Sequence, residues 1–72
     1  MKAVIYPESE NKQRVTVGGL VVGYVRRVPG GWAASTLTGD YISHDDGIVD
    51  AVRDVVAFSY PQILIEVVEE EL

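Results

Sequence analysis

The side chains with the most chemical potential in this chain form one short cluster, Ser43-His44-Asp45-Asp46. A hydroxyl, an imidazole and carboxylates can serve nucleophilic catalysis or bind a metal ion. Adjacent positions on the first turn of a helix diverge by about 100° each, so at most two of these side chains can meet one ion. His44 is the single histidine, no cysteine is present, and no nucleophile elbow or phosphate-cradling glycine loop occurs. We therefore expect a protein that is not an enzyme, with no catalytic residue, no metal site and no cofactor.

Charge is distributed unequally along the chain. Up to Gly39 the basic residues outnumber the acidic ones by five to two, a net of +3. From Asp40 onward nine acidic residues accompany Arg53 alone, a net of −8, and the two halves give the formal net charge of −5. Two electrostatically different surfaces on so small a protein predict a function in binding.

The acidic half predicts a partner-binding surface on a helix. Apolar residues recur at three- and four-residue spacing between Gly47 and Tyr60, which is typical of an amphipathic helix. At about 100° per residue, Asp46, Asp50 and Asp54 fall on its opposite side, about 6 Å apart along the axis. Such a row resembles a row of phosphates, although a merely solvated face has the same pattern. We expect a small acidic protein-binding module, with a DNA mimic or a phage-type modulator of a host protein as its specific form.

The basic half predicts an alternative, nucleic-acid binding through a sheet. An arginine-rich strand surface with an aromatic residue can contact phosphates and bases. The acidic half opposes phosphate binding, so we place nucleic acid second to a protein partner. The residues of this alternative site are Arg14, Arg26, Arg27 and Trp32.

The stretch Gly23-Tyr24-Val25-Arg26-Arg27-Val28-Pro29-Gly30-Gly31-Trp32-Ala33-Ala34 is followed by a turn and a helix that contains Asp50-Ala51-Val52. This half of the chain resembles the three-stranded-sheet-plus-helix arm-type domains of tyrosine integrases and the plant ethylene-response-factor DNA-binding domains. That resemblance implies a sheet that reads DNA. The stretch is also similar to short uncharacterised proteins of actinobacteria and their phages, which implies no activity.

A third alternative is a homo-oligomer that pairs through the C-terminal strand. A chain of 72 residues without cysteine has a small core and no disulfide, so self-association is one way to stabilise it. The predicted strand at 63–68 is apolar on both faces, which fits either a core strand or an edge that pairs with a second copy. The contacts of such a homodimer are Ile63, Ile65 and Val67.

The order of the predicted strands and helix indicates a small α+β fold. We predict the order β-β-β-β-α-β, a mainly antiparallel sheet of four to five short strands with one amphipathic helix packed on one face. Alternation on the third strand places Tyr24 and Arg26 on one face and Val25 and Arg27 on the other. The predicted elements are strands at 2–6, 13–17, 20–28 and 32–38, a short extension at 41–42, a helix capped by Ser43 and ending near Tyr60, and the strand at 63–68.

The chain is predicted to form a single domain over 1–72, of which 69–72 is a solvated acidic tail. Gly18-Gly19 fits a tight hairpin, with one long bent strand as the alternative. No export signal or membrane-spanning run is visible, so we expect a cytoplasmic protein that does not contact a membrane. The predicted core comprises Val4, Val22, Val25, Trp32, Leu37, Ile48, Val52, Val55, Ile63 and Ile65.

Overall fold

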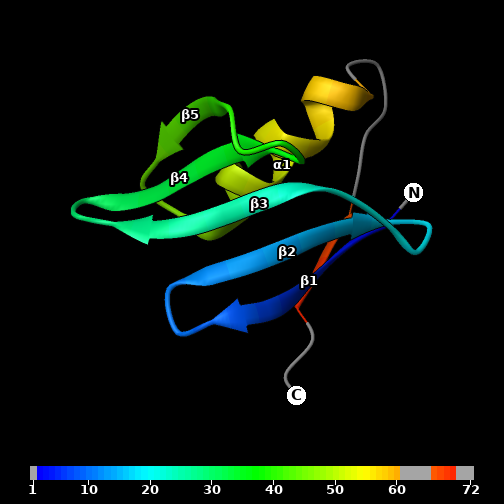
Figure 1. Cartoon of the computed structure of the whole chain (residues 1–72), viewed down its shortest axis with the longest axis horizontal. Helices are drawn as coiled ribbons and strands as arrows, with labels where there is room; N and C mark the ends of the chain where they lie inside the picture. The colour runs from blue at the N-terminus through cyan, green and yellow to red at the C-terminus, as the bar shows by residue number, and fades with distance from the viewer. Residues whose placement is uncertain (1, 61–65, 70–72) are drawn as a thin grey trace.

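Figure 1 shows a twisted sheet with a helix that lies behind it. The computed structural model describes residues 2–60 and 66–69. The elements in these residues form one α+β domain, which confirms the predicted fold class. They are β1 (Lys2–Ser9), β2 (Lys12–Val17), β3 (Leu20–Val28), β4 (Gly31–Thr36), β5 (Tyr41–Asp45), α1 (Ile48–Ser59) and β6 (Glu66–Glu69).

The strands are ordered β5-β4-β3-β2-β1-β6 across the sheet. Strands β1 to β5 pair antiparallel with their sequence neighbours, which confirms the mainly antiparallel sheet. β6 pairs in parallel with β1 at the other edge. The described part of the chain has one strand more than predicted, because the short extension expected at 41–42 is the strand β5. A parallel pairing needs a long crossover, and the segment that contains α1 provides it.

The structure describes only part of the region to which the C-terminal predictions apply. Residues 66–68 of the predicted strand belong to β6, and Val67 pairs with Ala3. Ile63 and Ile65 lie outside the described residues, as do 70–72 of the predicted tail. Glu69, expected to begin that tail, is instead the last residue of β6 and pairs with Ile5.

The hairpin between β2 and β3 has the geometry that Gly18-Gly19 predicts. Both glycines have positive φ, 60° and 83°. Positive φ at both central residues is the requirement of a type I′ turn, whose twist matches that of the flanking strands. The hairpin is therefore confirmed, and the alternative of one long bent strand is wrong.

The helix begins later than predicted. Ser43 is not its N-cap, because Ser43 and Asp45 belong to β5 and pair with Ala34 and Trp32 of β4. Helix α1 begins at Ile48, with the extended residue Gly47 as N-cap and no side-chain cap bond. Cross-strand pairing satisfies the backbone of the Ser43 segment, so it outweighs the local capping signal. The helix ends at Ser59, close to the predicted Tyr60, whose N–H donates to the Val56 carbonyl at 2.7 Å.

The core lies between the sheet and α1. Val25, Val52 and Val55 are buried as predicted, whereas Val22, Trp32 and Ile48 are only partly buried against the core. Leu37 is 55% exposed, because it follows the end of β4. Val4 is half-buried, because side chains alternate along β1 and its neighbours Ala3 and Ile5 point into the core. The buried apolar residues are Ala3, Ile5, Val15, Val17, Val25, Ala34, Ala51, Val52, Val55 and Val56.

Gly23 allows α1 to approach the sheet closely. It is buried in the middle of β3. A Cβ atom there would lie 2.6 Å from Cγ1 of Val55 and would also clash with the Ser35 carbonyl oxygen. The absence of a side chain at this position is therefore part of the helix–sheet packing.

Candidate functional site

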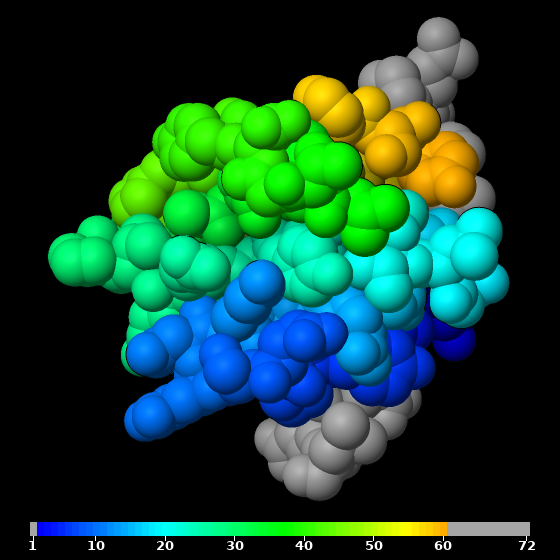
Figure 2. Space-filling model, viewed as in Figure 1, coloured from blue at the N-terminus to red at the C-terminus, as the bar shows by residue number. Residues whose placement is uncertain are grey.

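The face of the sheet opposite α1, which we call the open face, carries no other described element. In Figure 2 it is formed by the blue to green strand segments, while the yellow helix emerges at one edge. Residues paired across antiparallel strands point to the same face. One row of such pairs on the open face runs through β1, β2, β3, β4 and β5 and consists of Tyr6, Arg14, Tyr24, Ser35 and Tyr41.

A second row on the same face adds two further cations. Lys12 pairs with Arg26, Arg26 with Ala33, and Ala33 with His44. The two rows together define what we call the tyrosine-cation surface, which consists of Lys12, Arg14, Arg26, Tyr6, Tyr24 and Tyr41.

Cations lie over two of the three tyrosine rings of this surface. The Lys12 ammonium is 4.3 Å from the centroid of the Tyr24 ring. The Arg14 guanidinium is 5.1 Å from the centroid of the Tyr6 ring. Both distances are within the range of cation–π attraction. Tyr41 has no such neighbour among the described residues and is 70% exposed.

One cation of the surface is partly neutralised. Nη1 of Arg14 donates to Oε1 of Glu8 at 2.9 Å. This is the only ion pair among the side chains of residues 2–60. Lys12 and Arg26 therefore have no carboxylate partner among the side chains of residues 2–60, and their charges are not neutralised by an ion pair there.

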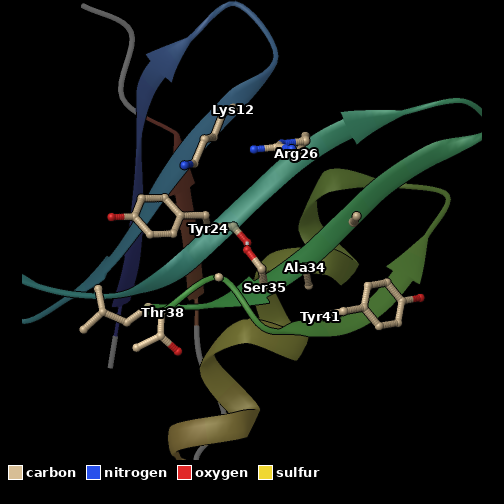
Figure 3. Close-up of a pocket in the computed structure, with 10 residues that line it drawn as sticks. Lys12, Tyr24, Arg26, Ala34, Ser35, Thr38 and Tyr41 are labelled. Carbon is tan, nitrogen blue, oxygen red and sulfur yellow. Dashed lines mark hydrogen bonds between the residues drawn. The ribbon is translucent and has the colours of Figure 1, made fainter.

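The open face is hollowed over β4. This strand contributes only small side chains there, Ala33 and Ser35, between longer ones on both sides. The resulting hollow has a volume of about 360 Å³. Figure 3 shows Lys12 and Arg26 at one end and Tyr41 at the other. The residues that line it include Lys12, Tyr24, Arg26, Ala33, Ser35, Leu37, Thr38, Gly39 and Tyr41.

The sequence-predicted cationic site is divided between the two faces. Arg14 and Arg26 belong to the open face, whereas Arg27 pairs with Trp32 on the other face. The Arg27 guanidinium is 5.1 Å from the centroid of the Trp32 ring, and Trp32 packs against the core. Neighbouring residues of a strand point to opposite faces, so Arg26 and Arg27 cannot share one.

Sequence reasoning missed the tyrosines and Lys12. The spacing of two between Tyr24 and Arg26, and between Lys12 and Arg14, was the available signal. Tyr41 gave no such signal. The register of β4 and β5 shifts so that Ala34 pairs with Ser43 and Ser35 with Tyr41. This bulge brings Tyr41 to the open face.

The predicted acidic row is not one helical stripe. Asp46 precedes α1, so only Asp50 and Asp54 lie on the helix. Asp54 is half-buried and accepts a hydrogen bond from the Ser43 hydroxyl at 2.6 Å. The row is therefore replaced by a cluster at the junction of β5 and α1, which we call the acidic surface: Asp45, Asp46, Asp50 and Asp54.

Two carboxyl groups of the acidic surface share one neighbourhood. The Ser43 hydroxyl oxygen lies 3.2 Å from Oδ2 of Asp45 as well as close to Asp54. A hydrogen bond with Asp54 raises the pKa of Asp45 above its ordinary value of 3.8, and partial burial and the negative charge of Asp54 add to this effect. One hydroxyl proton cannot serve both carboxylates fully, so protonation of Asp45 relieves their repulsion.

The position of the C-terminal strand bears on the predicted oligomer contact. β6 is at the edge of the sheet, next to β1. An edge position is one of the two alternatives that the sequence left open, and a core strand is the other. A homodimer through Val67, Ile63 and Ile65 stays a prediction, since the last two lie outside the described residues.

Comparisons of the chain with protein-family models, with curated proteins and with solved structures found no match. The coarse part of the resemblance to arm-type and ethylene-response-factor domains, a small antiparallel sheet with one helix, is present in the fold. Among residues 2–60 and 66–69, no helix is long and apolar enough to cross a membrane. Among the side chains of residues 2–60, no group of three or more histidine, cysteine, aspartate or glutamate residues is placed to hold a metal ion.

Proposed function

We propose that this protein is a non-enzymatic binding module that holds single-stranded nucleic acid on the open face of its sheet. The observation that supports the proposal is the tyrosine-cation surface, in which cross-strand pairing brings three cations and three tyrosines together on a face that no other described element covers. Proteins that bind single strands combine cations along the phosphate backbone with aromatic rings on which bases stack.

Each component of the surface has a part in such binding. The guanidinium and ammonium groups attract phosphates without regard to sequence. The tyrosine rings offer stacking, which every base can use. A sheet face presents both in fixed rows, because the strand spacing of about 4.8 Å sets the distance between neighbouring side chains.

The net charge of −5 does not cancel this local attraction. Asp45 pairs with Trp32 on the helix side, and Asp50 and Asp54 belong to α1, so these acids lie on the layer behind the sheet. The Debye length is about 8 Å at physiological ionic strength, so charges on the far layer are largely screened at the open face. The negative total is expected to weaken binding and slow association rather than abolish either.

The test is an anisotropy titration of fluorescent single-stranded DNA and RNA of about 12 nucleotides at low salt. The double variant Arg14→Gln/Arg26→Gln is expected to lower affinity about tenfold or more. Its matched control is Arg27→Gln/Arg53→Gln, which removes the same charge from the other face and from the exposed side of α1. Equal losses in the two variants, or no binding by the wild type at tens of micromolar, would contradict the proposal.

A second candidate is supported by the acidic surface. The negative charges of Asp50 and Asp54 both help to raise the pKa of Asp45, so these carboxyl groups are concentrated in a small area. Such an area suits a basic protein partner, in the manner of a modulator that occupies a nucleic-acid-binding groove.

The second candidate is tested with a lysine- and arginine-rich peptide. Asp46→Asn/Asp50→Asn removes two exposed charges and leaves the Ser43–Asp54 hydrogen bond in place. Affinity for the peptide is expected to fall several-fold in this variant, whereas Glu8→Gln/Glu10→Gln, an equal change elsewhere, should have little effect. Equal effects of the two variants would exclude a specific acidic surface.

A further inference from the structure

We infer that the hollow on the open face is a subsite for one nucleotide unit, whose base stacks on Tyr41 and whose phosphate lies between Lys12 and Arg26. This inference rests on the proposed function and assigns it a defined position. It follows from the shape of the hollow, from the one uncovered tyrosine ring and from the two cations without a carboxylate partner among the side chains of residues 2–60.

The shape of the hollow fits a single small ligand. Its volume of about 360 Å³ is near the lower end of the range of about 300–1,000 Å³ that is usual for ligand sites. Ala33 and Ser35 form its floor, so the space exists because β4 carries small side chains between Arg26 and Tyr41. One base with its sugar and phosphate is a ligand of this class.

Tyr41 is the tyrosine that is ready to accept a base. On Tyr24 and Tyr6 one face of the ring is already occupied by the ammonium of Lys12 or the guanidinium of Arg14. Tyr41 is 70% exposed, and no cation of the described residues lies over its ring. Stacking there removes no existing contact, so the full stacking attraction is available for binding.

Lys12 and Arg26 are the cations best placed for the phosphate. They are cross-strand neighbours and both line the hollow. Arg14 in the adjacent row is partly neutralised by Glu8. The Ser35 hydroxyl on the floor donates to the Tyr24 carbonyl at 3.4 Å, a long bond that leaves the hydroxyl available to the sugar or base.

The experiment is an NMR titration of the wild-type chain with uridine monophosphate, uridine and inorganic phosphate in separate arms. The nucleotide is expected to bind more tightly than either part alone, with the largest amide shifts at Ala33, Ser35 and Gly39. Tyr41→Leu should lower nucleotide affinity about tenfold, and Tyr41→Phe should retain it. Tyr6→Leu removes the same ring from the far end of the surface and should change affinity less than about threefold.

The outcomes separate this inference from the proposed function. Oligonucleotide binding without nucleotide binding, or equal losses in Tyr41→Leu and Tyr6→Leu, overturns the subsite and leaves the proposed function standing. Nucleotide binding without tighter oligonucleotide binding supports the subsite and overturns the proposed function. Failure of both ligands overturns both. Ala33→Val, which fills the hollow, provides an independent check, because unchanged nucleotide affinity in this variant also overturns the subsite.

Discussion

The two faces of the sheet are built from alternating residues of the same strands, and they differ in almost every property. The covered face packs Val15, Val25 and Ala34 against α1, and acids gather where β5 meets the helix. The open face carries the tyrosine-cation surface. The charge asymmetry along the sequence thus becomes in part a separation between two layers, with Asp45, Asp50 and Asp54 on the helix side and Lys12, Arg14 and Arg26 on the open face.

Small residues have opposite consequences on the two faces. On the covered face, Gly23 lets Val55 of the helix approach the sheet. On the open face, Ala33 and Ser35 leave a hollow, because no described element fills the space above them. The effect of a small side chain is therefore decided by what lies above it, and the following changes test that difference.

The largest effect is expected from Gly23→Ala. The new methyl group would overlap the Ser35 carbonyl oxygen and Cγ1 of Val55, so strand or helix has to shift. Overpacking of this kind lowers the free energy of unfolding by about 3 kcal/mol. Chemical denaturation measures it, with Ala33→Val as the matched enlargement on the open face. Equal destabilisation by Ala33→Val and Gly23→Ala would contradict the claim that only the covered face is closely packed.

The next effect concerns the salt dependence of oligonucleotide binding. Three cations on the open face predict a slope of about −2 for the logarithm of affinity against the logarithm of salt concentration, at about −0.7 per phosphate contact. The triple variant Lys12→Gln/Arg14→Gln/Arg26→Gln should reduce the slope to near zero. Anisotropy at several salt concentrations measures it. A slope that also disappears in Arg27→Gln/Arg53→Gln would mean that net charge, not the open face, controls binding.

A smaller effect is expected at the acidic surface, where the folded state raises the pKa of Asp45 mainly through its hydrogen bond with Asp54. The folded chain then binds a proton more tightly than the unfolded chain. The contribution of Asp45 to stability is therefore fully present below the ordinary pKa of 3.8, is lost as pH rises through the raised value, and is absent at neutral pH. Asp45→Asn removes the repulsion between the two carboxylates and should raise Tm at neutral pH.

Thermal melts from acidic to neutral pH measure this prediction, and Asp46→Asn is the control on the exposed neighbour. The wild type should lose more stability than Asp45→Asn as the pH rises. Identical pH profiles for the wild type and Asp45→Asn would mean that the interaction between Asp45 and Asp54 does not influence stability.

The smallest effect is expected from Glu8→Gln on the open face. This change releases Arg14 from its ion pair at 2.9 Å. Exposed ion pairs contribute up to about 1 kcal/mol, so oligonucleotide affinity should increase about twofold to fivefold. Glu10→Gln, an equal change of charge at an exposed turn residue, is the control in the same titration. An equal gain in the control would show that only net charge matters.

Much of the fold was predictable because its signals are local. The hairpin at Gly18-Gly19, the helix ending near Tyr60 and the antiparallel meander follow from turn residues and from hydrophobic periodicity. The start of the helix was not predictable from Ser43. Its capping signal competes with the pairing of Ser43 with Ala34 of the neighbouring strand β4, and that pairing is not visible in the residues around Ser43. Both a helix and a strand would satisfy the backbone hydrogen bonds of this segment, and the local sequence does not show which of the two makes the better tertiary contacts.

The candidate site divides in the same way. Alternation along β3 already placed Tyr24 with Arg26 and separated Arg27, because the side-chain period of a strand is two. Three features required the tertiary structure: the bulge that turns Tyr41 to the open face, the parallel pairing of β6 with β1, and the choice of the face that α1 covers. These depend on contacts between distant segments. The sequence by itself therefore determined which residues of one strand share a face, because the side-chain period of a strand is two. The register between strands and the packing of the helix decided which residues of neighbouring strands join them and which face no other described element covers.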